Sequence, residues 1–157
     1  MPSIHVDIAQ ADDLDDLVRL ETGLFTEDAG EHDALVDIRW PERHAREDFI
    51  RLLSNESALV LVARYDDKVA GHLVGYLGAP APTRFDRRTA EIRSLYVDES
   101  VRSSGVGQML VRDFEAWARD RAAAAVSVTA YTANGSARAF YEKLGFTEQS
   151  VVLRSVL

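Results

Sequence analysis

Alternating apolar and polar residues predict most of the strands of this chain. Residues 4–9 (IHVDIA) alternate strictly, which is the period of a half-buried strand. Residues 58–79 are rich in Val, Leu and Ala on both sides of Asp66 and Asp67, and this pattern predicts two strands joined by a hairpin turn. Further strands are predicted over residues 89–97, 124–131 and 145–157.

Apolar residues at helical spacing mark the segments between these strands. Helices are predicted over residues 11–25, 41–54, 106–121 and 136–144. Residues 26–40 lack a clean period, so we expect a loop there. The element order is therefore β-α-α-β-β-β-α-β-α-β, and we expect one mixed α/β (α+β) domain that spans residues 1–157.

The composition narrows the classes of protein that need to be considered. The 157 residues are enough for one domain with a full core, and no apolar run approaches the roughly 20 residues that span a bilayer. The N-terminus has neither a basic start nor an apolar signal core, so we expect a cytoplasmic protein that does not act at a membrane. The absence of cysteine excludes disulfides, thiolate metal sites and a cysteine nucleophile. The four histidines show no metal-ligand spacing, so we expect no metal.

The net charge of -8 is concentrated near the N-terminus. Residues 1–48 hold 14 acidic and four basic side chains, while the rest of the chain is slightly basic. A nucleic-acid binder would show a basic stripe, and this chain shows none, so no nucleic-acid partner is expected. The acidic segment is either a solvated helix face or the approach to a cationic substrate.

The junction between the strand at 89–97 and the following helix carries the sequence RSSGVG, residues 102–107. Its glycines either turn the chain or allow an anion to reach the free N–H groups at the helix start, where Arg102 would add charge. A Walker loop is excluded because no Gly-Lys-Ser/Thr follows. A dinucleotide-binding loop is excluded because Leu110 stands where a third glycine is needed.

RSSGVG is similar to the Arg/Gln-x-x-Gly-x-Gly/Ala signature of the GNAT superfamily of N-acetyltransferases, in which this loop and helix bind the pyrophosphate of acetyl-CoA. Residues 134–146 (NGSARAFYEKLGF) resemble the second signature of the family, Asn-x-x-Ala-x-x-Phe-Tyr-x-x-x-Gly-Phe. The element order also agrees, although residues 1–57 match in pattern only. The resemblance implies a GNAT-type mixed, largely antiparallel sheet flanked by about four helices, with acetyl-CoA as the cosubstrate and no metal.

The resemblance also implies which residues bind the coenzyme. In the family the strand before the loop offers backbone groups to the pantetheine. By position these belong to Leu95 and Val97, with the Leu95 N–H near the acetyl oxygen. Ser103 stands where many members have glycine, and with Ser104 it would add hydroxyl contacts to phosphate. The expected coenzyme-binding residues are Leu95, Tyr96, Val97, Arg102, Ser103, Ser104, Gly105, Val106, Gly107, Gln108, Asn134 and Tyr141.

Two residues are implied to be catalytic, each with an alternative. Tyr141 occupies the position of the family's tyrosine, which protonates the departing coenzyme sulfur, and its alternative is an aromatic that only packs. Glu91 lies six residues before Val97, the spacing of the base glutamate in the histone-acetyltransferase branch. A salt bridge to Arg93 is the alternative for Glu91, and a water relay would then serve as base. Asn134 either contacts the pantetheine and caps its helix or only caps it.

Several further side chains are weaker candidates. Arg138 would reach the phosphates of the coenzyme or face water. His32 and His44 fall in the presumed acceptor region and could help to deprotonate a substrate. Phe25 and Trp40 either wall the acceptor cleft or pack in the core, and we favour packing.

The sequence as a whole predicts an N-acetyltransferase that moves an acetyl group from acetyl-CoA directly to a primary amine, without a covalent acyl-enzyme. The acidic segment favours a small cationic molecule as the amine. Two alternatives stay open, namely acetylation of a protein lysine or N-terminus, and a non-catalytic acyl-CoA-binding module. Acceptor, acyl-chain preference and oligomeric state are not decided by the sequence, and a homodimer is one candidate.

Overall fold

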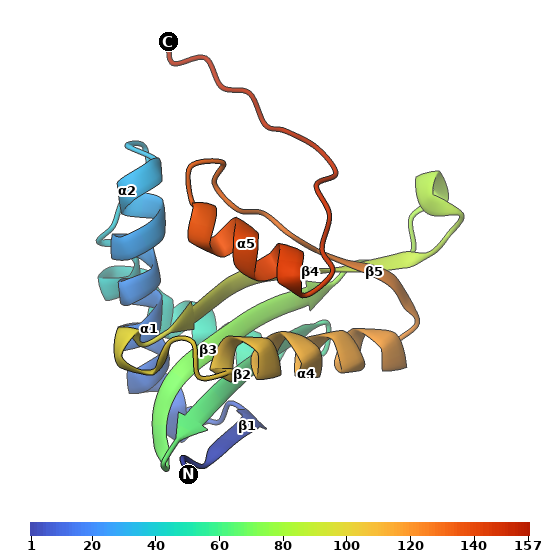
Figure 1. Ribbon diagram of the computed structural model, residues 1–157. Coiled ribbons are helices and arrows are strands. Elements are labelled where there is room, and N and C mark those ends of the chain that lie inside the picture. Colours follow the sequence, from blue (N-terminus) through green and yellow to red (C-terminus); the bar gives the residue numbers. More distant parts are fainter.

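Five strands form one sheet in the computed structural model of the chain, which describes residues 1–157 (Figure 1). The sheet order is β1-β2-β3-β4-β5, with antiparallel pairing up to β4 and parallel pairing between β4 and β5. The bounds are β1 Ile4–Ile8, β2 Ala58–Tyr65, β3 Lys68–Leu77, β4 Arg88–Val97 and β5 Ala123–Val128. The predicted hairpin is confirmed, because Asp66 and Asp67 both adopt positive φ, 49° and 69°, between β2 and β3.

The helices cover both faces of this sheet (Figure 1). Their bounds are α1 Leu14–Leu24, α2 Gly30–His32, α3 Arg46–Leu53, α4 Val106–Asp120 and α5 Gly135–Lys143. A π-helical turn, Phe25–Ala29, joins α1 to α2 without a break, and a second one, Pro41–Ala45, leads into α3. The four helical bodies and the largely antiparallel mixed sheet confirm the predicted fold class. None of these helices combines the length and apolarity that crossing a membrane requires.

Two apolar clusters hold the helices to the sheet. On one face, α4 buries Leu110 and Phe114 completely against Leu73 of β3. On the other face, α1 and α3 bury Leu17 and Phe49 completely against β2 and β3. Each fully buried Leu or Phe side chain contributes about 1.5–3 kcal/mol. Strands β2 and β3 are therefore held between two packed helical layers.

The loop predicted over residues 26–40 is wrong for its first part, because residues 26–32 are helical. A π-helical turn contains more residues per turn than an α-helix, so it breaks the apolar period of α1 where the helix continues. The Phe25 ring stacks on Trp40 with 5.7 Å between the centroids. Trp40 also packs against the apolar cluster under α1 and α3, as the core-packing interpretation expects, whereas Phe25 lies outside both apolar clusters.

The strand predicted over residues 145–157 is not formed. Helix α5 is followed by Gly145 at a φ of 96°, and no residue after it joins the sheet. Arg154 binds both carboxylate oxygens of Asp33, at 2.6 and 2.9 Å, and the segment leads away from β5 (Figure 1). Its apolar side chains, such as Val151 and Leu153, are exposed. Residues with strand propensity form a strand only where a neighbouring edge pairs with them.

Candidate active site

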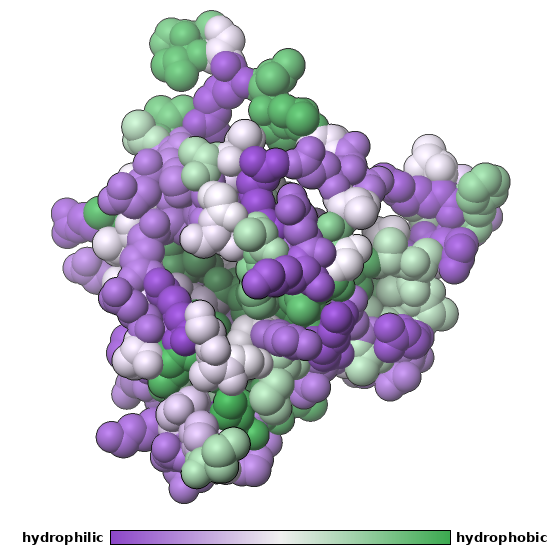
Figure 2. Space-filling view, viewed as in Figure 1, coloured by the Kyte–Doolittle hydropathy of each residue, from purple (hydrophilic) through white to green (hydrophobic).

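Strands β4 and β5 diverge, and the opening between them is the centre of the candidate site. Their parallel pairing ends at Ile92 and Val128, although β4 continues to Val97. Figure 2 shows a hollow with an apolar floor on this face, between the helical segment of residues 14–32 and α5. On that side, the last residues of β4 therefore line an opening instead of a neighbouring strand.

A β-bulge in β4 determines which backbone groups face this opening. The pairing register with β3 shifts by one residue, which leaves Arg93 as an extra residue on β4. Beyond the bulge, the Asp98 N–H donates to a β3 carbonyl at 2.8 Å. Because backbone groups alternate sides along a strand, the N–H groups of Leu95 and Val97 point away from β3 and into the opening.

The loop and helix start after β4 present a row of free backbone N–H groups. No carbonyl of the chain accepts from the N–H groups of residues 103–108, and the first bond of α4 runs from the Met109 N–H to the Gly105 carbonyl at 3.0 Å. Ser103 and Gly105 have positive φ angles of 65° and 95°, which turn neighbouring N–H groups toward one side. Together with the positive end of the helix dipole, this segment attracts an anion.

Two small residues shape this segment. A Cβ atom at Gly107 would lie 3.1 Å from the Phe140 ring, so glycine allows α5 to approach the start of α4. The Ser104 hydroxyl donates to the Val101 carbonyl within the loop. The Ser104 side chain therefore fixes the loop and does not point freely toward a ligand.

Asn134 and Tyr141 border the opening from α5. The Asn134 side chain accepts a hydrogen bond from the Ala137 N–H at 3.1 Å, which confirms its role as the helix cap. Tyr141 is 9% exposed, and its ring lies edge-on between Phe140 and Phe146. Burial, and to a lesser degree a nearby carboxylate, raises the pKa of Tyr141 above its usual 10.0. The hydroxyl thus keeps its proton at neutral pH and suits an acid better than a base.

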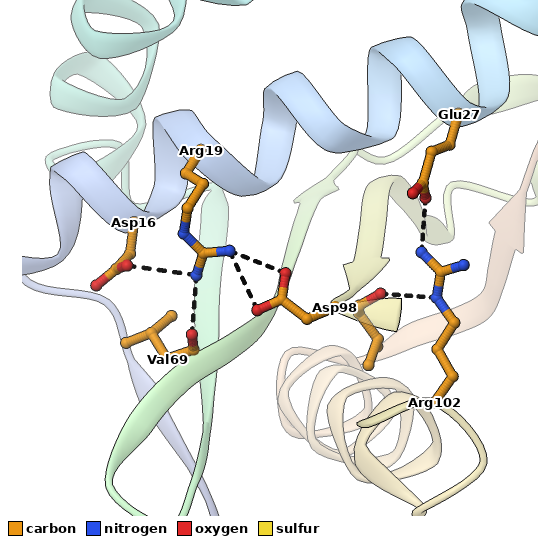
Figure 3. Close-up of polar contacts among 7 residues, drawn as sticks. Asp16, Arg19, Glu27, Val69, Asp98 and Arg102 are labelled. Carbon is orange, nitrogen blue, oxygen red and sulfur yellow. Dashed lines mark hydrogen bonds and ion pairs between the residues drawn. The ribbon is translucent and has the colours of Figure 1, made fainter. Parts of the chain in front are cut away.

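Acidic residues of the π-helical turn contact both borders of the opening. Glu27 accepts from the Arg102 guanidinium at 2.6 Å, and Arg102 also donates to the Val97 carbonyl at 2.8 Å (Figure 3). The next residue, Asp28, accepts from the Asn134 amide at 2.7 Å. The helical segment of residues 14–32 is thus joined by polar contacts to the loop before α4 and to the start of α5.

A second arginine, Arg19, connects α1 to the end of β4 by hydrogen bonds (Figure 3). Arg19 donates to Asp98 at 2.8 Å and to the Val69 carbonyl at 2.9 Å, and it lies 3.4 Å from Asp16. A cavity of about 570 Å³ adjoins these contacts, and none of the predicted coenzyme-binding residues lines it. Arg19 pairs with Asp16 and Asp98 within this lining, and Arg64 pairs with Asp7 and Asp13 outside it. We therefore place the chemistry in the opening between β4 and β5 instead.

Glu91 lies apart from Tyr141. Its neighbours Ala90 and Ile92 point into the core under α4, so Glu91 points to the opposite face of the sheet, where it is exposed. The alternative salt bridge to Arg93 is not formed, because Arg93 binds Asp48 of α3 at 2.9 Å. The role of Glu91 as a base stays a prediction.

The weaker candidates Arg138 and His32 contact other residues of the chain. Arg138 donates to the Thr132 carbonyl at 3.2 Å and pairs with Glu148, so it faces its own loop and the C-terminal segment. The His32 ring lies 5.5 Å from the Tyr131 ring. No group of three or more His, Asp and Glu side chains is arranged to hold a metal ion.

Sequence reasoning missed a buried polar cluster behind the bulge. Glu21 of α1 accepts hydrogen bonds from Ser94 of β4 at 2.9 Å and contacts His72 of β3 at 2.8 Å. The available signal was the position of Glu21 four residues after Leu17, on the apolar stripe of α1, and the placement of His72 within an apolar strand.

An opening between diverging strands, lined by free strand N–H groups and ending at an anion-binding helix start, suits an extended ligand with a phosphate end. An acyl thioester of coenzyme A is such a ligand. The model of the acetyltransferase (GNAT) family matches residues 15–146, and the chain belongs to this family of N-acetyltransferases. The family implies the use of acetyl-CoA.

Solved structures share the fold over almost the entire chain. A mutant of the BH1408 protein from Bacillus halodurans is 24% identical, with a TM-score of 0.87 over 98% of this chain and 99% of that one. An aminoglycoside 6'-N-acetyltransferase from Acinetobacter haemolyticus is 22% identical, with a TM-score of 0.75 over 98% and 97%. A ribosomal-protein-alanine N-acetyltransferase from Brucella melitensis is 19% identical, with a TM-score of 0.70 over 98% and 100%. No curated protein matches the sequence.

Proposed function

We propose that this acetyltransferase moves the acetyl group of acetyl-CoA directly to the primary amine of a small cationic molecule. The row of free N–H groups over residues 103–108, at the start of α4, is the observation that carries the donor part of the proposal. These groups and Arg102 would hold the pyrophosphate. In this structure the Arg102 guanidinium is paired with the Glu27 carboxylate. Coenzyme binding would replace this carboxylate with phosphate oxygens.

The residues around the opening supply the chemical requirements of acetyl transfer. The Leu95 N–H points into the opening and would donate to the thioester carbonyl oxygen, where negative charge develops as the amine attacks. The Tyr141 hydroxyl, protonated at neutral pH, would give its proton to the departing thiolate sulfur. The attacking amine must lose a proton, and Glu91 or a water relay would receive it. Asn134 would contact the pantetheine while it caps α5.

The acidic character of residues 26–33 supports a cationic acceptor. Glu27, Asp28 and Asp33 lie in or directly after the helical segment that borders the opening. Asp28, and Glu27 once phosphate replaces it on Arg102, would attract an ammonium group to the opening, where the ammonium would lose its proton to Glu91 or a water relay before it attacks. We also infer that the enzyme works in the cytoplasm, without a metal.

Acetylation of a protein N-terminus or lysine is the second candidate function. It is favoured by the structural similarity to a ribosomal-protein-alanine N-acetyltransferase, whereas the similarity to an aminoglycoside acetyltransferase favours small molecules. Both of these structures are less than 25% identical to this chain, so they do not indicate the acceptor. We prefer a small cationic acceptor because of the acidic residues 26–33 beside the opening.

A thiol-release assay tests the proposal. Acetyl-CoA is incubated with the protein and with polyamines, aminoglycosides, amino acids or short basic peptides, and free coenzyme A is measured. We expect the fastest release with a polyamine or an aminoglycoside. Release with peptides alone would support the second candidate. Thermal stabilisation by acetyl-CoA without any thiol release would indicate a non-catalytic acyl-CoA-binding module.

A further inference from the structure

Three polar side chains are enclosed in the apolar layer between α1 and the sheet. Glu21, His72 and Ser94 have exposures of 1%, 0% and 4%. Both carboxylate oxygens of Glu21 are engaged, one by the His72 Nε2 at 2.8 Å and the other by the Ser94 hydroxyl at 2.9 Å. The other ring nitrogen of His72 has no hydrogen-bond partner. The cluster thus joins α1, β3 and β4 and is closed to solvent.

Stability alone does not account for this cluster. Burial raises the pKa of Glu21, but the hydrogen bonds and charges around it, chiefly from His72, outweigh burial and bring the pKa below its usual value. Glu21 is therefore a buried carboxylate. Replacing such a group by a well-packed apolar side chain often leaves a protein equally stable. A role in fixing one specific geometry explains its presence better.

The geometry that the cluster fixes is the bulge of β4. Arg93 is the extra residue of the bulge, and both Arg93 and Ser94 point to the face covered by α1 and α3. Leu95 follows Ser94 directly, and its N–H is turned into the opening. The hydrogen bond from the Ser94 hydroxyl to Glu21 thus holds the residue whose peptide group carries the Leu95 N–H.

We propose that Glu21 and His72 are positioning residues for acetyl transfer. Through the Ser94 hydroxyl they hold the bulge of β4 so that the Leu95 N–H points at the thioester carbonyl. His72 contributes by holding the second oxygen of Glu21, while its own ring rests edge-on against Phe49, 6.2 Å between the centroids. The proposal rests on the role proposed above for Leu95.

The amide signal of Leu95 reports this contact without any acceptor. Heteronuclear NMR spectra of the labelled protein are recorded with coenzyme A and with acetyl-CoA, and the two spectra are compared. Their difference isolates the acetyl group, because both ligands carry the same pyrophosphate and pantetheine. We expect an acetyl-dependent shift at Leu95 in the wild type and none at Gly105 or Gly107. If Leu95 shows no such shift, the proposed role of Leu95 is wrong, and the positioning role is overturned with it.

Variants then separate the positioning role from the role of Leu95. Ser94→Ala and Glu21→Leu, which both remove the hydrogen bond from the Ser94 hydroxyl, are expected to lose most of the acetyl-dependent shift at Leu95 and to keep the signals of the pyrophosphate loop. Val60→Ala is the matched control, because Val60 is 3% exposed in the same apolar layer and makes no hydrogen bond to the cluster through its side chain. A wild-type shift at Leu95 in Ser94→Ala or in Glu21→Leu overturns the proposal, and so does an equal loss in Val60→Ala.

Steady-state kinetics supply a second readout, and they are measured with the amine that gives the fastest thiol release in the assay above. Loss of one well-placed donor to a developing oxyanion lowers kcat about 100- to 1,000-fold, and a misdirected donor should lose part of this. We expect Ser94→Ala to lower kcat by about 10- to 100-fold while the Kd of acetyl-CoA changes less than about threefold. Ser94→Thr keeps the hydroxyl and should recover most of kcat. A wild-type kcat in Ser94→Ala, or a loss that appears in Kd alone, contradicts the proposal.

Discussion

Replacing Tyr141 by phenylalanine tests the proposed general acid with little disturbance of the fold. The Tyr141 ring packs edge-on against Phe140 and Phe146, at 5.0 and 5.4 Å between centroids, and phenylalanine keeps these contacts. The hydroxyl makes no hydrogen bond to another group of the chain. The free energy of unfolding should therefore change by less than about 1.5 kcal/mol, the bound for a volume-conserving swap.

We expect Tyr141→Phe to lower the turnover number and not the affinity for acetyl-CoA. A positioned general acid contributes about 100- to 10,000-fold to the rate, which corresponds to about 3–5 kcal/mol in the activation free energy. Thiol release at saturating acetyl-CoA and amine gives kcat, and titration calorimetry gives the Kd of acetyl-CoA. We expect kcat of Tyr141→Phe to fall by at least about 100-fold with little change in Kd. Because the pKa of Tyr141 is raised above 10.0, the wild type should show no loss of activity from this group as the pH rises to 9.

Tyr131→Phe is the matched control for this experiment. Tyr131 lies beside His32 and also has a raised pKa, first because of burial and then because of the carboxylates of Asp33 and Asp28. It is not part of α5, so its substitution should leave kcat close to the wild type. An unchanged kcat in Tyr141→Phe would refute the acid role, and an equal loss in kcat and in coenzyme affinity would show that Tyr141 only packs.

Four further predictions concern the loop before α4, its contact with Glu27, and the buried Glu21. Glu27→Gln should tighten acetyl-CoA binding by up to about fivefold in calorimetry, because it frees Arg102 from an exposed ion pair worth about 0.2–1 kcal/mol. Arg102→Ala should weaken acetyl-CoA binding about 10- to 100-fold. Ser103→Gly should raise the free energy of unfolding in urea by about 0.5–1 kcal/mol, because Ser103 has a φ of 65°; a loss would contradict the strain. Because the pKa of Glu21 is lowered in the folded protein, Glu21 stabilises the fold at pH values above its unfolded pKa, near 4.5. This stability is lost as the pH falls through the folded pKa. Glu21→Gln should therefore reduce the decrease in the free energy of unfolding at acidic pH, measured by urea titrations at different pH.

The elements of the sheet could be predicted where local pattern alone decides structure. The hairpin at Asp66 and Asp67 needs only two strands and a turn that tolerates positive φ, and all of this is local. The loop with free N–H groups before α4 could also be predicted, because Gly105 and Gly107 follow a strand and open a helix within a few residues. Local pattern was sufficient for this loop.

The bulge and the buried cluster could not be predicted, because they depend on contacts between distant segments. Strict alternation puts Ser94 on the face opposite Arg93, and only the register with β3 shows that both point to α1 and α3. Glu21 lies 51 residues from His72 and 73 from Ser94, so no local pattern indicates that the three meet. Similarly, Arg93 and Glu91 do point to the same face as expected, but the charge partner of Arg93 comes from α3.

Residues 26–32, whose helical structure the sequence pattern does not predict, contact both borders of the opening. In a helix successive side chains diverge by about 100°, so two consecutive carboxylates can reach two different borders of one opening. Glu27 contacts the Arg102 guanidinium in the loop before α4, and Asp28 contacts Asn134 at the start of α5. A pyrophosphate on Arg102 would release the Glu27 carboxylate beside the opening, where its charge could attract an ammonium group. Acetyl-CoA would then prepare the site for a cationic amine, and the choice of acceptor would depend on the helical segment and not on the motifs that identify the family.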